Sequence, residues 1–417
     1  MFTGLSECFA LSAVRRTTYT ICNLPHPQYK AQPPEFVYPG GLFFACSNSI
    51  LIHIFSVGMR PQRKGILKTI ADFINPYGWV TKARNKAFDK NLLESRRFDI
   101  PTICIGNISV GGTGKTPHTE YLIRLLKERE RVAVLSRGYG RKSSGYIKAG
   151  PDTTMQTIGD EPFQIKQKFP EITVAVCEKR VTGVENLLNE QEAPTAILLD
   201  DAFQHRHIKA GLNILLVDYN RPIWNDCILP FGLLRESEKG AERADIVIIT
   251  KCNKEITKEQ MQNCKARLQT KEGTPVFFST VEYGTPYPLF PEVANREFVL
   301  KKGINTLLLT GIAKPGPLKK VVEKNGAKVT LMQYPDHHNF TAGDIEKIAE
   351  TFDKMQGNKL ILTTEKDATR LRSIDNLPQS IKENIYAIPI RVKILNDEEE
   401  LFNKKIIYYV TENSRNS

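Results

Sequence analysis

The sequence has no long apolar run and no cysteines with metal-binding spacing. Its best candidate for a membrane span, residues 42–57, is interrupted by Asn48, Ser49 and His53 and is shorter than the ~20 apolar residues that a span needs. The eight cysteines form no CxxC pair and no Cys/His cluster with zinc-finger spacing, and several lie within apolar runs. We therefore expect no ordinary transmembrane helix and no zinc site, and the thiols should be reduced and mostly structural.

The composition is otherwise that of a globular protein. With 417 residues, of which 41% are hydrophobic and 25% charged, the chain is long enough for two domains. The formal net charge of +12 favours an anionic partner, such as nucleic acid, an anionic membrane face or a phosphorylated substrate. Charge alone does not choose among them. The sequence contains no internal repeat and no low-complexity tract.

The first 92 residues divide into two segments. Residues 1–58 show no sustained hydrophobic period; they are either an extension, expected to be disordered, or upstream sequence joined to a chain that begins at Met59, and we favour the second interpretation. Residues 59–92 contain a basic, amphipathic helical pattern from Gly65 to Phe88, which Pro76 should kink or divide. Such a helix can lie in a membrane interface. An ordinary helix packed on the domain, with its charges solvated, has the same pattern.

Strands and helices alternate in the rest of the chain. In residues 93–272, apolar runs predict strands at 101–106, 131–135, 173–177, 195–199, 212–217 and 245–250, and helical patterns cover 117–127, 181–189 and 257–269. This alternation predicts an α/β fold with a parallel sheet covered by helices on both faces. Residues 273–291, rich in Gly, Pro, Thr and aromatics, are predicted to be a hinge or linker. Residues 292–417 are predicted to form a second, smaller α/β unit with strands at 306–310, 328–333, 360–363 and 385–390 and helices at 317–324 and 342–354.

The segment from Gly106 to Thr116 follows an apolar strand and precedes a helix, which is the context of a P-loop. Glycines let backbone N–H groups point at phosphate oxygens, and the helix N-terminus adds positive potential. The residues predicted to bind the nucleotide are Gly111, Gly112, Thr113, Gly114, Lys115 and Thr116. Lys115 would reach the β- and γ-phosphates, and the Thr116 hydroxyl would ligate Mg²⁺. The strict pattern has Gly where this chain has Ser109, and the alternative is a glycine-rich turn with an incidental Lys-Thr pair. The fold class expected is therefore a P-loop NTPase-type sheet.

A P-loop needs a second carboxylate at the end of a nearby strand to hold the metal. Asp200 and Asp201 follow the apolar run 196–199 and meet this need. Adjacent residues of a strand point to opposite sides, so one of the two should face the Mg²⁺ while the other orients a neighbour. The alternative is a solvated strand end.

Several other segments form a set together with the P-loop. They are Ser136–Arg141 (SRGYGR), Gly159–Pro162 (GDEP), Asp200–Arg206 (DDAFQHR), Leu229–Pro230 with Leu234–Glu236, and Asp336–His338 (DHH). The set resembles the tetraacyldisaccharide 4'-kinases, which are membrane-associated enzymes that add the 4'-phosphate to the lipid A precursor in Gram-negative bacteria. The resemblance covers about Met59 to the C-terminus, and residues 1–58 have no counterpart. Ala202 stands where the family usually has Gly.

The resemblance implies roles for the matching residues. Asp160 would take the proton from the sugar hydroxyl, and His337, after Asp336, would pair with it across a cleft. Lys115, Mg²⁺ and Arg235 would neutralise charge on the transferred phosphoryl group. The resemblance further implies that Glu161 and Asp201 lie near the metal and that the substrate cleft is lined by Arg137, Tyr139, Gln204, His205, Arg206 and Glu236.

Less specific interpretations of the same residues exist. Asp160 could cap a helix that begins at Glu161-Pro162. The segment 336–339 could be a polar loop, and His338 could be the relevant histidine in place of His337. Arg137 could be a solvated charge, and Tyr139 could serve packing.

The function expected from the resemblance is transfer of the γ-phosphate of ATP, with Mg²⁺, to the 4'-hydroxyl of a tetraacyldisaccharide 1-phosphate. The expected partners are this lipid A precursor and an anionic membrane surface, with no nucleic acid and no obligate protein partner. The expected location is the cytoplasmic face of the inner membrane, as a peripheral or monotopic protein. The main alternative is a P-loop switch or partition-type ATPase, although the segment 250–253 lacks the Asp of a guanine-specificity motif. A kinase of a soluble molecule and a nucleic-acid binder are further alternatives, the last suggested by charge alone.

Overall fold

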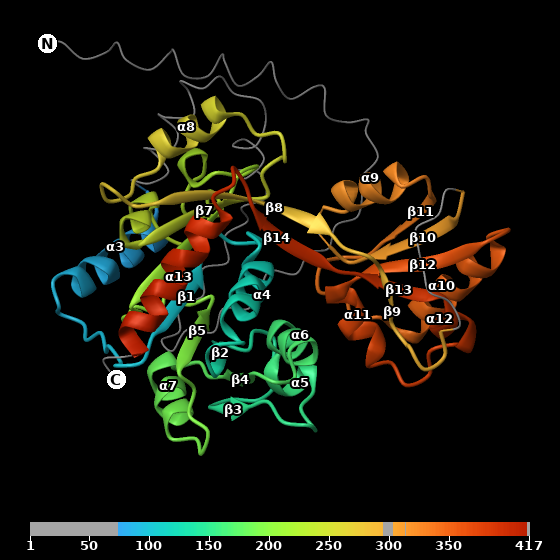
Figure 1. Ribbon diagram of the computed structural model, residues 1–417, viewed down its shortest axis with the longest axis horizontal. Coiled ribbons are helices and arrows are strands. Elements are labelled where there is room, and N and C mark those ends of the chain that lie inside the picture. The colour runs from blue at the N-terminus through green and yellow to red at the C-terminus, as the bar shows by residue number, and fades with distance from the viewer. Residues whose placement is uncertain (1–73, 295–302, 313, 415–417) are drawn as a thin grey trace, which may run out of the picture. The chain divides into compact units, whose positions relative to one another are not determined.

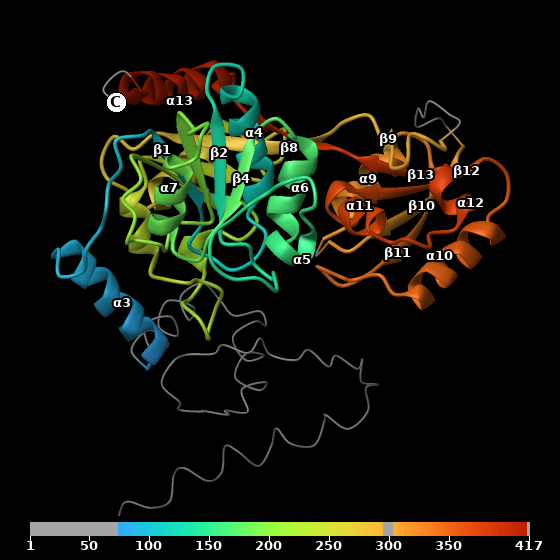
Figure 2. The same cartoon turned by 90° about the horizontal axis from the view of Figure 1, so that it is seen from below.

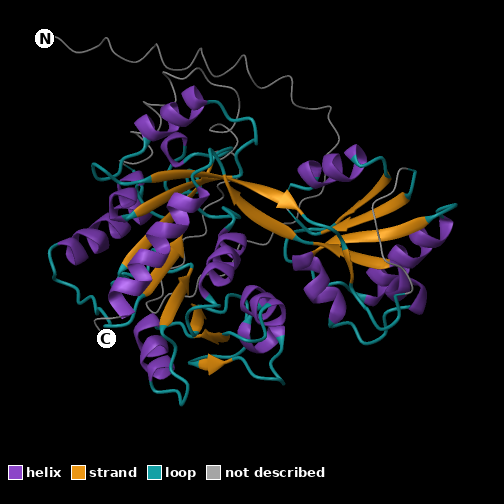
Figure 3. Ribbon diagram, in the orientation of Figure 1, coloured by secondary structure: helices purple, strands orange, loops and turns teal. Residues whose placement is uncertain are grey.

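The computed structural model describes residues 74–294, 303–312 and 314–414, all of which belong to one compact unit, Gly58–Ser417 (Figure 1). The predicted extension 1–58 and the first part of the predicted amphipathic segment lie outside the described residues. Of the helices that are described, none combines the length and the apolarity needed to cross a bilayer. The described part of the fold is built on two sheets (Figure 3).

The larger sheet has nine strands in the order β14-β8-β7-β6-β1-β5-β2-β4-β3. Neighbours from β8 to β4 pair in parallel, and the edge strands β14 and β3 pair antiparallel. The predicted strands are confirmed to within one or two residues. In chain order the nine are β1 (Thr102–Gly106), β2 (Val132–Ser136), β3 (Ile147–Lys148), β4 (Thr173–Val176), β5 (Ala196–Asp200), β6 (Leu212–Asp218), β7 (Ile246–Thr250), β8 (Val276–Tyr283) and β14 (Ile390–Ile394).

Both faces of this sheet are covered, as the continuous apolar runs predict. Ile103 and Ile105 of β1 join the core beneath α4 (Lys115–Leu126), α6 (Asp160–Lys168) and α13 (Glu399–Ser414), whereas Cys104 joins the opposite core with α7 (Arg180–Leu188) and α8 (Lys258–Arg267). Figures 1 and 2 show α4 and α13 along the same sheet. Because the strands are parallel, their carboxyl ends, including those of β1 and β5, meet at one edge.

The smaller sheet has five strands in the order β11-β10-β12-β13-β9, and only β9 is antiparallel to its neighbour. Its helices also lie on both faces: α10, α11 and α12 contribute to one core and α9 to the other. The strands are β9 (Tyr287–Pro288), β10 (Asn305–Thr310), β11 (Lys328–Gln333), β12 (Lys359–Thr364) and β13 (Ile385–Ile388), and the helices are α9 (Gly316–Lys324), α10 (Ala342–Lys354), α11 (Glu365–Arg372) and α12 (Gln379–Asn384). The predicted second α/β unit is therefore present.

The division of the chain between the two sheets differs from the prediction. The predicted linker 273–291 contains β8, whose Phe277 and Phe278 are buried in the cores of the larger sheet. Glycines on either side of β8 made the sequence of this segment resemble a loop. The predicted C-terminal unit 292–417 is also divided between the two sheets. After β13 the chain returns to the larger sheet as β14 and α13, where Phe402 and Ile406 of α13 pack in the same core as α4.

The first described helix is α3 (Pro76–Asp89), and Pro76 occupies its first turn, where a missing N–H is tolerated. Asn75 caps the helix by accepting from Gly78 N (3.0 Å) and attaches it to the segment between β6 and β7 by donating to Leu229 O (2.8 Å). Phe88 is buried at the other end, while Trp79 is 53% and Val80 68% exposed. The described helix therefore packs on the domain and also presents apolar side chains to the outside.

Candidate active site

The predicted P-loop has the expected backbone geometry. It runs from the end of β1 to the start of α4, and Gly111 and Gly114 have φ of 97° and 89°, which side chains rarely adopt. Gly106 admits no side chain, because a Cβ there would lie 2.6 Å from Phe203 Cβ. Inside the turn, Asn107 Nδ2 donates to Thr113 Oγ1 (2.7 Å). The turn is thus closed by its own side chains and opens a helix whose N-terminal amides suit an anion.

Neighbouring strand ends brace the loop from outside. The Thr250 hydroxyl at the end of β7 donates to Thr113 O (2.8 Å), and the Lys251 ammonium contacts Gly112 O. On the other side, Val110 N donates to Leu233 O (2.7 Å). The loop conformation is therefore held from two sides by contacts distant in sequence.

Lys115 and Arg235 both face Asp201. Lys115 Nζ lies 3.6 Å from Asp201 Oδ2, and Arg235 Nη1 lies 3.1 Å from Oδ1. Burial raises the pKa of Asp201, but the two cations outweigh it and hold that pKa below its ordinary value. This carboxylate is neutralised by protein charges and orients the two groups that are suited to contact phosphate.

Asp200 has the opposite environment. It is 1% exposed, accepts from the Thr119 hydroxyl at Oδ1 (3.2 Å), and its Oδ2 has no hydrogen-bond partner among the described residues. Burial first, and then the charges of Glu161 and Asp201, raise the pKa of Asp200 to about 7. A buried oxygen without a partner, in a site that disfavours negative charge, fits a cation ligand.

The carboxylates predicted to hold the metal do not form one protein cage. In the part of the chain that is described, no group of three or more His, Cys, Asp or Glu side chains is close enough to bind a metal by itself. Mg²⁺ is usually held by one or two carboxylates together with waters and substrate phosphates. Asp200, with Thr116 in the first turn of α4, fits that pattern better than Asp201, which is occupied by Lys115 and Arg235.

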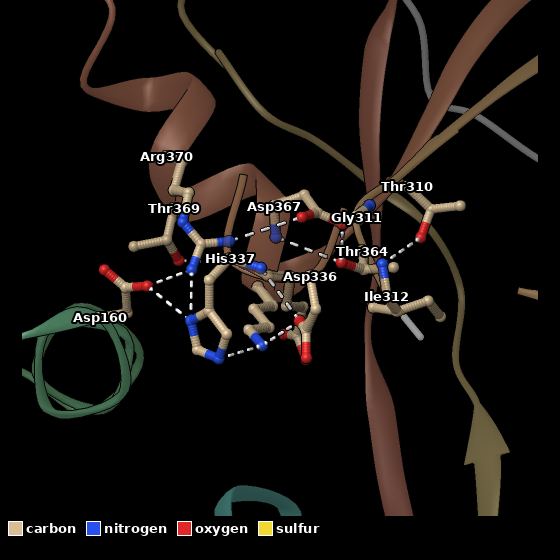
Figure 4. Close-up of polar contacts among 12 residues, drawn as sticks. Asp160, Thr310, Gly311, Ile312, Asp336, His337, Thr364, Asp367, Thr369 and Arg370 are labelled. Carbon is tan, nitrogen blue, oxygen red and sulfur yellow. Dashed lines mark hydrogen bonds and ion pairs between the residues drawn. The ribbon is translucent and has the colours of Figure 1, made fainter. Parts of the chain in front are cut away.

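Asp160 and His337 meet, as predicted from the resemblance (Figure 4). Asp160 opens α6 after Gly159, and His337 lies in the loop after β11 with its Nδ1 3.1 Å from Asp160 Oδ2. Burial raises the pKa of Asp160, but hydrogen bonds and charges from His337 and Arg370 lower it to about 2. Asp160 is therefore an ionised carboxylate paired with an imidazole.

His338, the alternative, is placed elsewhere. Its Nε2 lies 2.9 Å from Asp344 Oδ2 at the start of α10, and its ring stacks on Tyr334 with centroids 4.7 Å apart. His338 thus anchors the loop, and His337 is the histidine that reaches Asp160.

The residues predicted to line a cleft have mixed environments. Glu236 is buried and accepts from Asn85, Gln204 and Arg243 (2.8, 3.0 and 2.8 Å), so it fastens α3 and the loop after β5 together rather than facing an open space. Gln204 also donates to Asn107 O at the start of the P-loop (2.7 Å). Burial, followed by the charges of Arg180 and Arg137, lowers the pKa of His205 to about 4.

The remaining cleft candidates lie near the surface. Arg137 is exposed and Tyr139 is 76% exposed, which suits contact with a ligand and does not support the packing alternative for Tyr139. Arg206 donates to Asn85 O (2.9 Å) and pairs with Asp89 (2.7 Å), so it holds α3.

Two residues near Asp160 were not anticipated from the sequence. Arg370 and Lys366, both from α11, contact His337, and Arg370 also contacts Asp160. Their signal is the segment Thr364–Arg372, in which a capping Thr after an apolar strand begins a short charged helix. Lys366 and Arg370 are four residues apart and so share one face of it.

Comparisons with known proteins agree with one another. The family model described as Tetraacyldisaccharide-1-P 4'-kinase matches residues 69–407. The chain is 47% identical to the Tetraacyldisaccharide 4'-kinase of Phocaeicola vulgatus over 364 residues, covering 85% of this chain and 99% of the relative. It is 48% identical to that of Bacteroides thetaiotaomicron over 351 residues, covering 82% and 92%. The crystal structure of an "apo" form of LpxK from Aquifex aeolicus in complex with ATP is similar, with a TM-score of 0.61, 30% identity and coverage of 82% of this chain and 99% of that one.

Proposed function

The chain belongs to the Tetraacyldisaccharide-1-P 4'-kinase family, and we propose from this membership and from the site that it transfers the γ-phosphate of ATP to the 4'-hydroxyl of a tetraacyldisaccharide 1-phosphate. It is accordingly a kinase of lipid A biosynthesis. The fold is that of the ATP-bound relative, and the glycine-rich loop before α4 supports the proposal.

Nucleotide binding rests on the loop from Gly106 to Lys115. Its inward amides and the α4 N-terminus bind the phosphates, and Lys115 and Arg235, both held by Asp201, face the charge on the transferred phosphoryl group. Asp200 and Thr116 would hold Mg²⁺, which supplies further charge neutralisation when it is bound. Asp201 then serves to orient the two cations.

The acceptor hydroxyl is activated by Asp160. A proton passes from the sugar hydroxyl to the Asp160 carboxylate as the oxygen attacks the γ-phosphorus, the bond between that phosphorus and the β–γ bridging oxygen breaks, and ADP leaves. The observation that carries this proposal is the position of the α6 N-terminus. Gln164 and Lys168 of α6 donate to Glu120 of α4 (3.2 and 2.7 Å), so the helix that Asp160 opens packs against the helix that the P-loop opens.

We further propose that the protein acts at an anionic membrane surface, at the cytoplasmic face of the inner membrane. Exposed Trp79 and Val80 on α3, with Lys82, Arg84 and Lys86 on the same helix, are the combination that interfacial helices use. Arg84 also donates to Gln204 O (3.2 Å), which attaches this helix to the loop after β5. A lipid substrate could therefore be taken from the surface close to the catalytic residues.

The test is transfer of radiolabelled phosphate from ATP to tetraacyldisaccharide 1-phosphate in mixed micelles, measured for the wild type, Asp160→Ala and the exposed-carboxylate control Asp152→Asn. We expect labelled lipid with the wild type and the control and at least a ~100-fold lower kcat with Asp160→Ala, since general-base catalysis contributes about 10²–10⁴-fold. Near-normal turnover of Asp160→Ala would remove Asp160 from the mechanism. ATP hydrolysis without any labelled lipid would favour the switch ATPase.

A further inference from the structure

We propose that Arg370 is a positioning residue for phosphoryl transfer, which holds the Asp160 carboxylate by one oxygen so that the other faces the acceptor hydroxyl. The inference rests on the proposed role of Asp160 as the base. It extends the site to α11, a helix that the sequence did not point to.

The contacts with Asp160 converge on a single oxygen. The Arg370 guanidinium donates to Asp160 Oδ2, and His337 Nδ1 lies 3.1 Å from the same atom (Figure 4). Among the described residues no hydrogen bond reaches Oδ1, and the Asp160 side chain is 31% exposed. One oxygen is thus fixed from two directions, and the other remains available to a hydroxyl from outside.

The charge of Arg370 does not by itself favour catalysis. A guanidinium beside a carboxylate stabilises the ionised form and so weakens it as a base. In phosphoryl transfer, however, the transition state is loose and catalysis depends mainly on the placement of the reacting groups. The benefit of Arg370 therefore has to come from geometry, because its electrostatic effect on Asp160 acts in the opposite direction.

Arg370 is itself buried beside a second carboxylate. Its side chain is 3% exposed and its Nη1 lies 3.6 Å from Oδ1 of the fully buried Asp367. Asp367 Oδ2 accepts from the Thr364 hydroxyl (2.7 Å) and from Gly311 N (2.9 Å). A Cβ on Gly311 would lie 2.9 Å from Asp367 Oδ1, so the backbone can approach this carboxylate only at a glycine. The ends of β10 and β12 thereby fix Asp367, whose charge faces the guanidinium.

The same helix also orients His337. Lys366 Nζ lies 3.0 Å from His337 Nε2 and donates to Asp336 Oδ1 (2.6 Å). His337 Nδ1 thus faces both Asp160 and Arg370, and its Nε2 faces Lys366. Two cations on one face of α11 therefore set both members of the Asp160–His337 pair.

The experiment measures kcat and KM for Arg370→Met, Arg370→Lys and the double variant D367N/R370M, which removes the buried charge pair together. Arg372→Gln is the matched control: Arg372 is on the same helix, is exposed, and contacts Leu289 O rather than Asp160. We expect kcat to fall about 100-fold in the Met variants, the loss typical of a misplaced reacting group, while KM for ATP stays within about two-fold. Arg370→Lys should recover part of the loss, and Arg372→Gln should retain wild-type kcat.

A double-mutant cycle with Asp160→Ala separates positioning from a general effect on folding. If Arg370 acts through Asp160, Arg370→Met should lower kcat no further in the Asp160→Ala background. An equal loss in both backgrounds, a rise in KM for ATP that parallels the loss, or a kcat within about three-fold of wild type in the folded double variant would overturn the inference. Near-normal turnover of Asp160→Ala alone would instead refute the proposed base and is recognised independently of Arg370.

Discussion

Replacement of Asp200 by asparagine should stabilise the nucleotide-free protein while abolishing its activity. Asp200 is buried, one of its oxygens has no partner among the described residues, and burial together with Glu161 and Asp201 raises its pKa to about 7. Its negative charge is therefore unfavourable until a cation arrives. Asparagine has the same shape and no charge, so the variant removes both the energetic cost of the buried charge and the carboxylate that would bind Mg²⁺.

The magnitude follows from the pKa difference between the folded and unfolded states. With an unfolded pKa of about 3.8 and a folded pKa of about 7, the raised pKa lowers the unfolding free energy by about 4 kcal/mol at pH 8, where the folded group is ionised, and by about 2 kcal/mol at pH 5, where it is protonated. The folded state retains the proton between these two pKa values and the unfolded state does not. Wild-type stability contributed by this group is therefore highest below about pH 4 and falls as the pH rises to about 7.

The assay is urea denaturation at pH 5 and pH 8 without nucleotide or divalent metal. We expect Asp200→Asn to exceed the wild type by about 2 kcal/mol more at pH 8 than at pH 5, whereas the exposed-carboxylate control Glu242→Gln should show no such pH-dependent difference. Added Mg²⁺ and ATP should stabilise the wild type more than the variant, because a ligand that binds only the folded state raises its stability. Equal stabilities of wild type and Asp200→Asn at pH 8 would refute the reasoning.

Two further predictions concern other parts of the fold. Lys168→Met should lower the unfolding free energy, measured by urea denaturation, by about 3–5 kcal/mol. The Lys168 ammonium lies 2.7 Å from both Glu120 and Glu365, so its removal takes a cationic partner from two buried carboxylates. A change below about 1 kcal/mol would contradict this. Trp79→Ser should weaken flotation of the protein with anionic liposomes and leave ATP binding unchanged. The control is Tyr408→Ser, which replaces a comparably exposed aromatic on α13 and should float like the wild type. Equal flotation of both variants would exclude α3 as the membrane contact.

Local pattern carried most of the fold prediction. Six strands of the larger sheet, β1, β2, β4, β5, β6 and β7, were predicted within one or two residues because they are short, continuous apolar runs between helices. The P-loop was predicted because Gly111, Gly114 and Lys115 have few alternative uses after a strand. The strand β8 was missed because Gly273 and Gly284 flank it, and a short strand between glycines is hard to distinguish by composition from a linker.

Nonlocal contacts account for what the sequence could not indicate. Glu236 was predicted in a cleft from a motif, but its hydrogen bond with Asn85, 151 positions away, makes it part of the attachment of α3. Arg370 is 210 positions from Asp160, so no periodicity or spacing relates them. The resemblance to a family, not the pattern, indicated that Asp160 and His337 belong together, and the structure brings them within 3.1 Å.

Two chain crossings between the sheets are a narrower candidate for the hinge predicted over 273–291. The chain passes between the sheets after β8 and again between β13 and β14, and at these crossings Gly284 N donates to Pro389 O (2.9 Å). The buried core clusters of the two sheets share no residue within the described ranges, and the hydrogen bonds between α6 and α11 are made by charged pairs, Asp160 with Arg370 and Lys168 with Glu365.

The contacts between α6 and α11 are of a kind that can open without unfolding. Separating α6 from α11 would expose charged groups that water can solvate rather than an apolar core, so opening would cost far less than unfolding either sheet. The hinge predicted from the sequence would then lie at Gly284 and Pro389, and closing the ion pairs would bring His337 to Asp160. On this argument the charged contacts between α6 and α11 could open and close around the predicted hinge while each sheet keeps its own core intact.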